Sequence, residues 1–265
     1  PGGAIPRIAK SERPEAIAPV EAMLDEADGV MVARGDLGVE VGPEAVPILQ
    51  KRIILAANRH RRLVITATQM LESMTRHPRP TGAEASDVVN AIFDGTDAVM
   101  LSAETATGQY PVEAVRVMDR IVRAAEEGTE PGVVRVADQV PYTTGYFPEA
   151  MCAAACSAVL RTRADAVVIF SESGTTVRLM SKQRPAAPIV AVTPTELIRR
   201  RMALYWGVVP LTMPRIDETD ERVVEIERRL KEDGLAKSGQ RIVILSGTIV
   251  GQRGGTNVMK LHEVV

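Results

Sequence analysis

A short stretch of charged and flexible residues, Arg34-Gly35-Asp36-Leu37-Gly38, follows the apolar run Val30–Ala33. The apolar run predicts a buried strand, and in barrels of parallel strands the chemistry sits on the loops at the carboxyl ends of the strands. Glycines let backbone N–H groups approach an anionic ligand closely, and the carboxylate of Asp36 suits a hard divalent metal. By itself the stretch fits an ordinary strand-to-helix turn with a solvated aspartate equally well.

The same arrangement of an apolar run and polar residues occurs four times in the first half of the chain. The four cases are Ile5–Ala9 with Lys10-Ser11-Glu12, Val30–Ala33 with Arg34-Gly35-Asp36, Leu63–Ala67 with Thr68-Gln69, and Ala98–Leu101 with Ser102-Ala103-Glu104-Thr105. Segments with helical periodicity follow, at Pro14–Glu26, Glu44–Arg59, Ala83–Phe93 and Pro111–Glu127. Strands that alternate with helices predict a parallel sheet, so the polar residues should converge at one end of it. We expect this of Lys10, Glu12, Asp36, Thr68 and Glu104.

The second half of the chain predicts a further α/β unit. Its expected elements are helix 148–161, strand Ala166–Phe170, helix 175–183, strand Ile189–Val192, helix 195–205, strand Val208–Leu211, helix 218–234, strand Arg241–Leu245 and a last strand near Asn257–His262. A charged segment with glycine and proline at 126–132 breaks the preceding helix, and residues 133–147 look irregular. We therefore expect one domain over residues 1–130 and another over residues 131–265.

A loop in the second half combines hydroxyl groups, a glycine and the start of a helix. Its residues are Ser171, Ser173, Gly174, Thr175 and Thr176. Such a combination predicts an anion site, although helix capping by a hydroxyl group explains the same residues. Arg178 and Lys182 lie on one face of the helix that follows, and the glycine-rich turn Thr248–Thr256 could close over a ligand.

The composition is that of a globular protein with a sizeable core. The chain has 265 residues, 45% of them hydrophobic, and a formal charge of −2, which gives no reason to expect nucleic acid as a partner. There is no run of about 18 apolar residues, so we expect no membrane span. Cys152 and Cys156 lie on one helix face, which favours core residues over a metal site, and the three histidines are scattered.

The ordered set of motifs resembles the pyruvate kinase family. The resemblance is carried by IAKSERPEA (8–16), MVARGDLGVE (31–40), ITATQMLESM (65–74), the segment 78–115, SGTTVRLMSKQRP (173–185) and GTIVGQRGGTNVMKL (247–261). The chain departs from the family pattern at Ser11, Gly82 and Ala103, where the family usually has an apolar residue, arginine and glycine. These departures bear on local packing and subunit contacts more than on the reaction.

The resemblance implies the last four βα units of a TIM-type (β/α)8 barrel, followed by a separate three-layer α/β domain. The first four strands and an inserted lid domain are absent, and the chain opens on Pro1-Gly2-Gly3 without a methionine. We expect the chain to be the C-terminal part of a longer protein. A genuine half-barrel is the alternative, and it would need a partner to cover its open sheet edges.

For function, the resemblance implies phosphoryl transfer from phosphoenolpyruvate to ADP, giving pyruvate and ATP in glycolysis. Glu12 and Asp36 match the ligands of Mg²⁺ or Mn²⁺, and Lys10 matches the lysine that stabilises the phosphoryl group and the enolate. The backbone N–H groups of Gly35 and Asp36 match those that hold the substrate carboxylate. Thr68 matches the threonine near the carbon that is protonated, where a hydroxyl group would relay a proton through water. Ser102 and Glu104 would support that relay.

The remaining implications concern partners. The loop Ser171–Thr176 matches one that holds the phosphate of an allosteric sugar phosphate or nucleotide. The family also implies a cytoplasmic homotetramer, and K⁺ whose ligands, like the nucleotide contacts, would lie mostly outside this chain.

Each residue has a simpler explanation. Lys10 fits a surface lysine, Glu12 an acid that complements a helix dipole, and Thr68 a helix cap. Arg34 fits a structural ion pair as well as a catalytic role. Two other functions stay open: a metal-dependent lyase or aldolase of the phosphoenolpyruvate/pyruvate barrel class, and a truncated, non-catalytic chain that binds a phosphorylated metabolite.

Overall fold

The chain divides into two compact units, residues 1–141 and 142–265. The computed structural model describes residues 5–17, 19–128, 145–248 and 254–265. The domain boundary predicted at residues 130 and 131, and most of the irregular segment predicted at 133–147, lie outside the described residues and stay predictions. Within the described ranges, every helix is too short or too polar to span a membrane.

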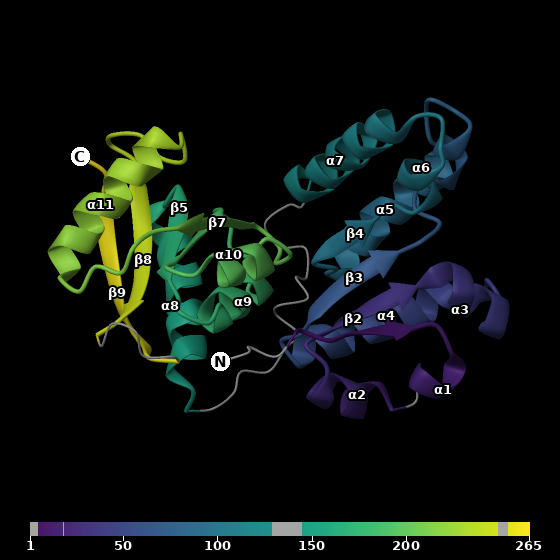
Figure 1. Cartoon of the computed structure of the whole chain (residues 1–265), viewed down its shortest axis with the longest axis horizontal. Helices are drawn as coiled ribbons and strands as arrows, with labels where there is room; N and C mark the ends of the chain where they lie inside the picture. Colours follow the sequence, from purple (N-terminus) through teal and green to yellow (C-terminus); the bar gives the residue numbers. More distant parts are fainter. Residues whose placement is uncertain (1–4, 18, 129–144, 249–253) are drawn as a thin grey trace. The chain divides into compact units, whose positions relative to one another are not determined.

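The first unit is built on a parallel sheet whose strand order follows the sequence, β1-β2-β3-β4 (Figure 1). Its elements are β1 (Ile8–Ser11), α1 (Pro14–Ile17), α2 (Val20–Glu26), β2 (Gly29–Ala33), α3 (Arg34–Val41), α4 (Val46–Arg59), β3 (Leu63–Ala67), the 3₁₀ helix η1 (Glu72–Thr75), α5 (Gly82–Asp94), β4 (Ala98–Met100), α6 (Ala103–Ala106) and α7 (Pro111–Glu127). Ala33 pairs with Ala67, and Ala67 pairs with Met100. The chain therefore leaves these three strands at one level of the sheet.

One face of this sheet carries the core of the first unit. Val30 and Val32 of β2 and Val64 of β3 pack against buried side chains of the helices, in a cluster with Leu24, Leu37, Ile53 and Ile54. Side chains alternate between the two faces of a strand, so the intervening Met31 and Ile65 lie on the other face. Both are only partly buried. The helices therefore cover one face of the sheet much better than the other.

The second unit has a five-stranded sheet in the order β7-β6-β5-β8-β9, in which only the edge strand β9 runs antiparallel. Its elements are α8 (Phe147–Thr162), β5 (Ala166–Phe170), α9 (Thr175–Lys182), β6 (Ile189–Thr193), α10 (Glu196–Met202), β7 (Val208–Thr212), α11 (Thr219–Glu232), β8 (Arg241–Gly247) and β9 (Thr256–Glu263). Each unit thus mixes helices with a largely parallel sheet, which confirms the predicted α/β class.

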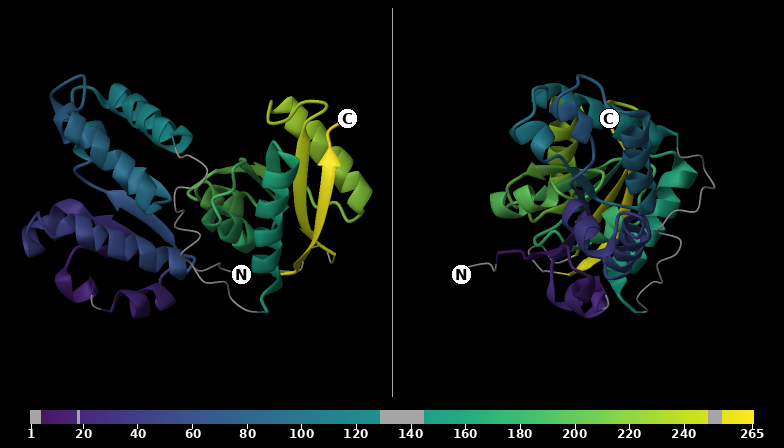
Figure 2. Two further views of the ribbon diagram at one scale, coloured as in Figure 1. Left: turned by 180° about the vertical axis from the view of Figure 1, so that it is seen from behind. Right: turned by 90° about the vertical axis from the view of Figure 1, so that its right-hand side faces the viewer.

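Helices cover both faces of the second sheet. Val167 and Ile169 of β5 belong to one core with α8, α9 and α10, whereas Ala166 and Val168 belong to another core with α11. Figure 2 shows α8 and α11 on opposite faces of the sheet. Central strands buried on both faces explain why these segments read as unbroken apolar runs. Cys152 lies in the first of these cores and Cys156 packs against it, as expected of core cysteines.

Most predicted elements match the observed ones within one to three residues, and three differences are informative. The helix predicted at Pro14–Glu26 is two helices, α1 and α2, because Pro19 has no N–H group to continue the ladder. The first strand begins at Ile8 rather than Ile5 and includes Lys10 and Ser11. The segment predicted as a loop after β2 is the helix α3, which starts at Arg34 without a connecting loop.

Candidate functional site

A lysine and two carboxylates come together beside β1 and β2. Lys10 lies within β1, Glu12 follows the strand, and Asp36 lies in the first turn of α3. The Lys10 Nζ atom is 2.5 Å from Glu12 Oε2 and 2.7 Å from Asp36 Oδ2. The two carboxylates are therefore neighbours, although 24 residues separate them in the sequence.

The charges of this cluster support one another. Hydrogen bonds from Lys10 to Asp36 and to Glu12 raise the pKa of the lysine well above its usual range. The same ammonium group lowers the pKa of Asp36. The side chains are 51%, 36% and 57% exposed for Lys10, Glu12 and Asp36. Exposed ion pairs stabilise a fold weakly, so the cluster is better suited to meeting a ligand than to holding the unit together.

The donor set fits a hard divalent cation that shares its coordination with other ligands. Mg²⁺ prefers oxygen ligands and usually keeps several waters or substrate oxygens alongside one or two carboxylates. Glu12 and Asp36 offer two such carboxylates. In the described ranges, no group of three or more His, Cys, Asp or Glu side chains is placed to hold a metal ion by itself. Any metal at this cluster would therefore need oxygen atoms from a substrate or from water.

The Thr68 hydroxyl group lies against the start of α3. It accepts a hydrogen bond from Gly35 N at 2.8 Å and donates to Ala67 O at 2.7 Å. A Cβ atom at position 35 would stand 3.3 Å from Thr68 Oγ1, so the absent side chain permits this close approach. The Gly35 N–H group, expected to face a substrate carboxylate, thus already has a partner with which a carboxylate would compete. No helix follows Ala67 directly, so Thr68 does not cap a helix of its own segment; it accepts from the first turn of α3 instead.

Ser102 and Glu104 are placed differently from Lys10 and its partners. The Glu104 side chain is fully buried, and its two oxygens accept hydrogen bonds from Leu71 N at 3.0 Å and from Ser102 N at 2.7 Å. Its carboxylate therefore ties the loop after β3 to the loop after β4. Glu104 follows β4 at the end of the sheet where the polar residues were expected, but both of its oxygens accept backbone hydrogen bonds inside the protein.

The loop Ser171–Thr176 in the second unit is held by its own hydroxyl groups. Gly174 N donates to Ser171 Oγ at 3.0 Å, and the hydroxyl groups of Ser173 and Thr175 are 3.0 Å apart. Gly174 has a φ of 80°, a conformation that favours glycine, and it precedes the first turn of α9. The Thr176 hydroxyl group is 2.7 Å from that of Thr256, which joins this loop to the start of β9.

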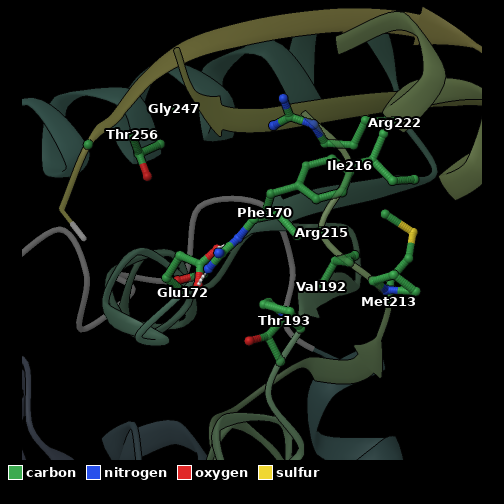
Figure 3. Close-up of a pocket in the computed structure, with 14 residues that line it drawn as sticks. Phe170, Glu172, Val192, Thr193, Met213, Arg215, Ile216, Arg222, Gly247 and Thr256 are labelled. Atoms are coloured by element: carbon green, nitrogen blue, oxygen red, sulfur yellow. Dashed lines mark hydrogen bonds and ion pairs between the residues drawn. The ribbon is translucent and has the colours of Figure 1, made fainter. Parts of the chain in front are cut away.

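A pocket adjoins this loop, and two arginines that sequence reasoning missed line it (Figure 3). Arg215 forms an ion pair with Glu172 at 2.8 Å. Arg222 is only 6% exposed, and its guanidinium group lies 5.3 Å from the centre of the Phe170 ring. The available signal was its spacing, because Arg222 stands one and two turns before the core residues Ile226 and Leu230 on the apolar face of α11.

Two other cations, Lys182 and Arg178, were expected near this loop. Lys182 is buried, and the Nε atom of Arg178 is buried without a hydrogen-bond partner in the described structure. Residues 249–253 of the turn Thr248–Thr256 lie outside the described residues, so the closing role of that turn stays a prediction.

Comparison with known proteins gives one family for both units. Residues 2–115 match the family model described as pyruvate kinase, barrel domain, and residues 149–262 match pyruvate kinase, alpha/beta domain. The chain is 46% identical over 257 residues to a pyruvate kinase of Geobacillus stearothermophilus and 42% identical over 259 residues to one of Clostridium perfringens. Each alignment covers 97% of this chain.

A solved structure is similar over the same range. The crystal structure of a pyruvate kinase from Cryptosporidium parvum superimposes with a TM-score of 0.90 at 36% identity, over 97% of this chain and 51% of the other. The Geobacillus and Clostridium relatives are covered over 44% and 54% of their lengths. The chain therefore spans about half the length of these relatives.

Proposed function

The chain belongs to the pyruvate kinase family, and we propose that the protein it represents transfers a phosphoryl group from phosphoenolpyruvate to ADP, giving pyruvate and ATP. The observation that carries this proposal is the cluster of Lys10, Glu12 and Asp36, with Thr68 against the start of the same helix. A lyase or aldolase could share such carboxylates, but the match of residues 149–262 to the second pyruvate kinase domain favours the kinase.

Lys10 supplies positive charge where the reaction concentrates negative charge. The P–O bond of phosphoenolpyruvate breaks, a terminal phosphate oxygen of ADP forms the new P–O bond, and the enolate of pyruvate is left. Both the phosphoryl group and the enolate are anionic, and a preorganised cation stabilises them without reorganising solvent. The two carboxylates favour the protonated form of Lys10, because their hydrogen bonds raise its pKa.

Glu12 and Asp36 would hold a divalent cation, Mg²⁺ or Mn²⁺, together with substrate oxygens and water. When bound, the cation would neutralise charge on the enolate and phosphoryl oxygens. It would compete with the Lys10 ammonium group for the same carboxylate oxygens, so that Lys10 could turn towards the substrate. The K⁺ requirement of the family belongs to the same proposal, with no ligand assigned within this chain.

Thr68 serves the second step, in which the enolate carbon gains a proton. The Thr68 hydroxyl group would give up its proton as the new C–H bond forms, and water would restore it. A hydroxyl group is a weak acid, so its placement matters more than its acidity. The hydrogen bonds with Gly35 N and Ala67 O are what place it.

Turnover by a completed protein tests this proposal. The completed protein is residues 1–265 joined to the parts of the Geobacillus stearothermophilus relative that this chain does not match. Lys10→Met should lower its kcat on the order of 10²–10³-fold, since it removes a charge directed at the transition state. Lys51→Met is the matched control, because Lys51 is an exposed lysine that pairs with Asp94. Near-normal turnover by Lys10→Met would refute the role of Lys10.

The finer architecture is part of the proposal. The four βα units of the first unit would be the last four of an eight-stranded barrel, with the missing strands pairing with β1 and β4. Assembly as a homotetramer and a cytoplasmic location follow from the family in the same way. The Ser102 hydroxyl group is still proposed to support the proton relay. Glu104 contributes only by holding together the loops after β3 and β4.

The second unit is proposed to bind a phosphorylated effector at the loop Ser171–Thr176 and the adjoining pocket. The support is the cation of Arg222, whose Nε atom is buried and has no hydrogen-bond partner in the described structure. Such a group is costly unless a ligand satisfies it. The hydroxyl groups of the loop and the N-terminus of α9 would complete the phosphate contacts.

Thermal melts test the effector site. Fructose bisphosphate, glucose 6-phosphate, ribose 5-phosphate and AMP would each be added to the chain. A ligand that binds only the folded state should stabilise it by about 2.7 kcal/mol at 100 times its dissociation constant. Ser173→Asp should abolish the shift because it places a negative charge in the loop, whereas Ser157→Asp, on the exposed surface of α8, should not. If none of these compounds shifts the melt, the loop is only a helix cap.

A further inference from the structure

Two residues after β3 have an unusual backbone. Thr68 has a φ of 66° and Gln69 a φ of 52°. Side chains other than glycine seldom adopt this region, and for a β-branched residue such as threonine it is a genuine outlier. A strained conformation of this kind persists only where its surroundings hold it in place. The contacts around Thr68 and Gln69 should therefore include a group that fixes them.

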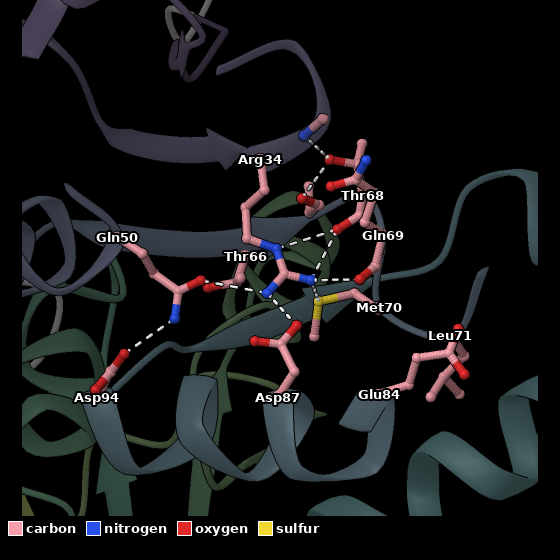
Figure 4. A network of polar contacts seen from close by, with 12 residues as sticks. Arg34, Gln50, Thr66, Thr68, Gln69, Met70, Leu71, Glu84, Asp87 and Asp94 are labelled. Atoms are coloured by element: carbon pink, nitrogen blue, oxygen red, sulfur yellow. Dashed lines mark hydrogen bonds and ion pairs between the residues drawn. The ribbon is translucent and has the colours of Figure 1, made fainter. Parts of the chain in front are cut away.

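Arg34 makes those contacts (Figure 4). Its Nε and Nη2 atoms both donate to Thr68 O, at 3.1 Å and 2.9 Å, and Nη2 also donates to Gln69 O at 2.7 Å. The guanidinium group reaches Met70 Sδ as well, at 2.8 Å. The Arg34 side chain thus contacts three successive residues of the loop. Its hydrogen bonds fix the orientation of the Thr68 and Gln69 carbonyl groups.

The position of Arg34 is itself set by the helices behind the sheet. Its side chain is 5% exposed, and a buried charge needs a partner. Asp87 of α5 supplies one as an ion pair with Nη1, and Gln50 of α4 approaches the same nitrogen at 3.4 Å. Gln50 in turn donates to Asp94 Oδ2 at 2.9 Å. Arg34 is therefore anchored to two helices while its other nitrogens hold the loop.

The far end of the same loop is held independently. The buried carboxylate of Glu104 accepts from Leu71 N. Arg34 therefore determines the backbone at Thr68 and Gln69, where the chain leaves β3, and Glu104 determines where the loop continues. Of these two contacts, only Arg34 bears directly on the residue whose hydroxyl group lies against Gly35 N.

We propose that Arg34 is the positioning residue for proton delivery: by holding Thr68 in its left-handed conformation it directs the Thr68 hydroxyl group to the site where the enolate is protonated. This inference rests on the proposed function. Arg34 does not touch the substrate and acts through the backbone of Thr68. A lysine could not replace it, because a single ammonium nitrogen lacks the planar fork that spans two carbonyl groups and still reaches a carboxylate.

The proton step can be isolated by following the exchange of pyruvate methyl hydrogens with D₂O, which is protonation of the enolate in reverse. In the completed protein, Arg34→Lys should slow this exchange on the order of 10²-fold, the smaller end of what one placed proton donor contributes. The KM for phosphoenolpyruvate should change far less. Lys51→Met, which removes another cation that pairs with α5, should leave the exchange unchanged.

A double-mutant cycle separates positioning from general damage. If Arg34 acts through Thr68, Thr68→Ala should slow the exchange at least as much as Arg34→Lys, and adding Arg34→Lys to it should have little further effect. Multiplied effects in the double variant would overturn the proposal. So would normal exchange in a folded Arg34→Lys protein.

Amide exchange of Gly35 gives a readout that does not depend on turnover. Because Gly35 N donates to Thr68 Oγ1, Arg34→Lys should make this amide exchange faster with solvent, and Lys51→Met should not. An unchanged Gly35 amide in Arg34→Lys overturns this inference alone. If the unsubstituted completed protein shows no turnover and no methyl exchange, the proposed function falls, and the role of Arg34 in it falls too.

Discussion

The two sheets of this protein differ in how much of them is covered. In the second unit every residue of β6 is buried, and the two faces of β5 belong to separate cores. In the first unit, by contrast, the central strands β2 and β3 each have a residue that is only partly buried, Met31 and Ile65, whereas edge strands are partly exposed in both units. The helices of the first unit cover one face of its sheet, and the residues with chemistry lie at the other.

This difference indicates which of the two units needs further protein to bury its sheet. The second unit buries both faces of its central strands, so its core does not need further elements. Within the described residues, the first unit leaves the middle of one face of its sheet partly exposed, at Met31 and Ile65. The exposed positions include Lys10, whose neighbours carry the proposed reaction. The same partial exposure thus affects the stability of the first unit and its chemistry.

The largest expected effect comes from separating the units. Residues 142–265 should fold alone and melt cooperatively, because both of their cores lie within that range. Residues 1–141 alone should melt broadly or associate, because one face of their sheet is only partly covered by the described residues. Circular dichroism melts and amide exchange of the two pieces measure this. A sharp, concentration-independent melt of residues 1–141 would contradict the comparison.

A matched pair of core substitutions makes the comparison quantitative. Ile169→Ala removes a fully buried side chain from the second unit and should cost about 2–5 kcal/mol. Ile65→Ala removes the same atoms from a partly buried position in the first unit and should cost roughly 1 kcal/mol. Urea unfolding followed separately for the two units measures both. In the completed protein, the destabilisation by Ile65→Ala should rise towards that by Ile169→Ala. Equal destabilisation by the two substitutions in residues 1–265 alone would contradict the difference in burial.

The smallest expected effect concerns a hydroxyl group on the covered face of the first sheet. Ser11 is fully buried, and its Oγ atom has no hydrogen-bond partner in the described structure. Ser11→Ala should therefore stabilise the first unit by about 1 kcal/mol, since an unsatisfied buried group is costly. Thr66→Val removes a hydroxyl group that donates to Thr96 and should destabilise by a similar amount. A loss of stability in Ser11→Ala would show that the Ser11 hydroxyl group is satisfied, by water for example.

The sequence predicted most elements well because burial leaves a clear apolar pattern in strands and helices. Strands β3 and β5 and helix α7 have the predicted bounds, since short apolar runs and helical spacing are clear there. Helix α3 was missed because Gly35 and Gly38 lower its helix propensity. Its first turn forms where the strand ends, held by a contact with Thr68 that no local pattern reveals.

The site was predictable where residues leave parallel strands at one level, and unpredictable where distant segments meet. Lys10, Glu12 and Asp36 fall at neighbouring strand ends, so the fold class alone brings them together. The role of Arg34 depends on contacts with residues 34 and 53 positions away and on the backbone conformation of Thr68. Arg215 and Glu172 likewise meet across 43 residues. Such pairs are set by tertiary packing, which no single-sequence pattern encodes.

The most direct test of the central claim is turnover of phosphoenolpyruvate and ADP by residues 1–265, alone and as the completed protein. Water exclusion strengthens every charge interaction in a site, and an open sheet cannot provide it. The account predicts no pyruvate from the chain alone, Mg²⁺-dependent pyruvate formation by the completed protein, and loss of that activity with Lys10→Met but not Lys51→Met. Robust pyruvate formation by the uncomplemented chain would contradict it.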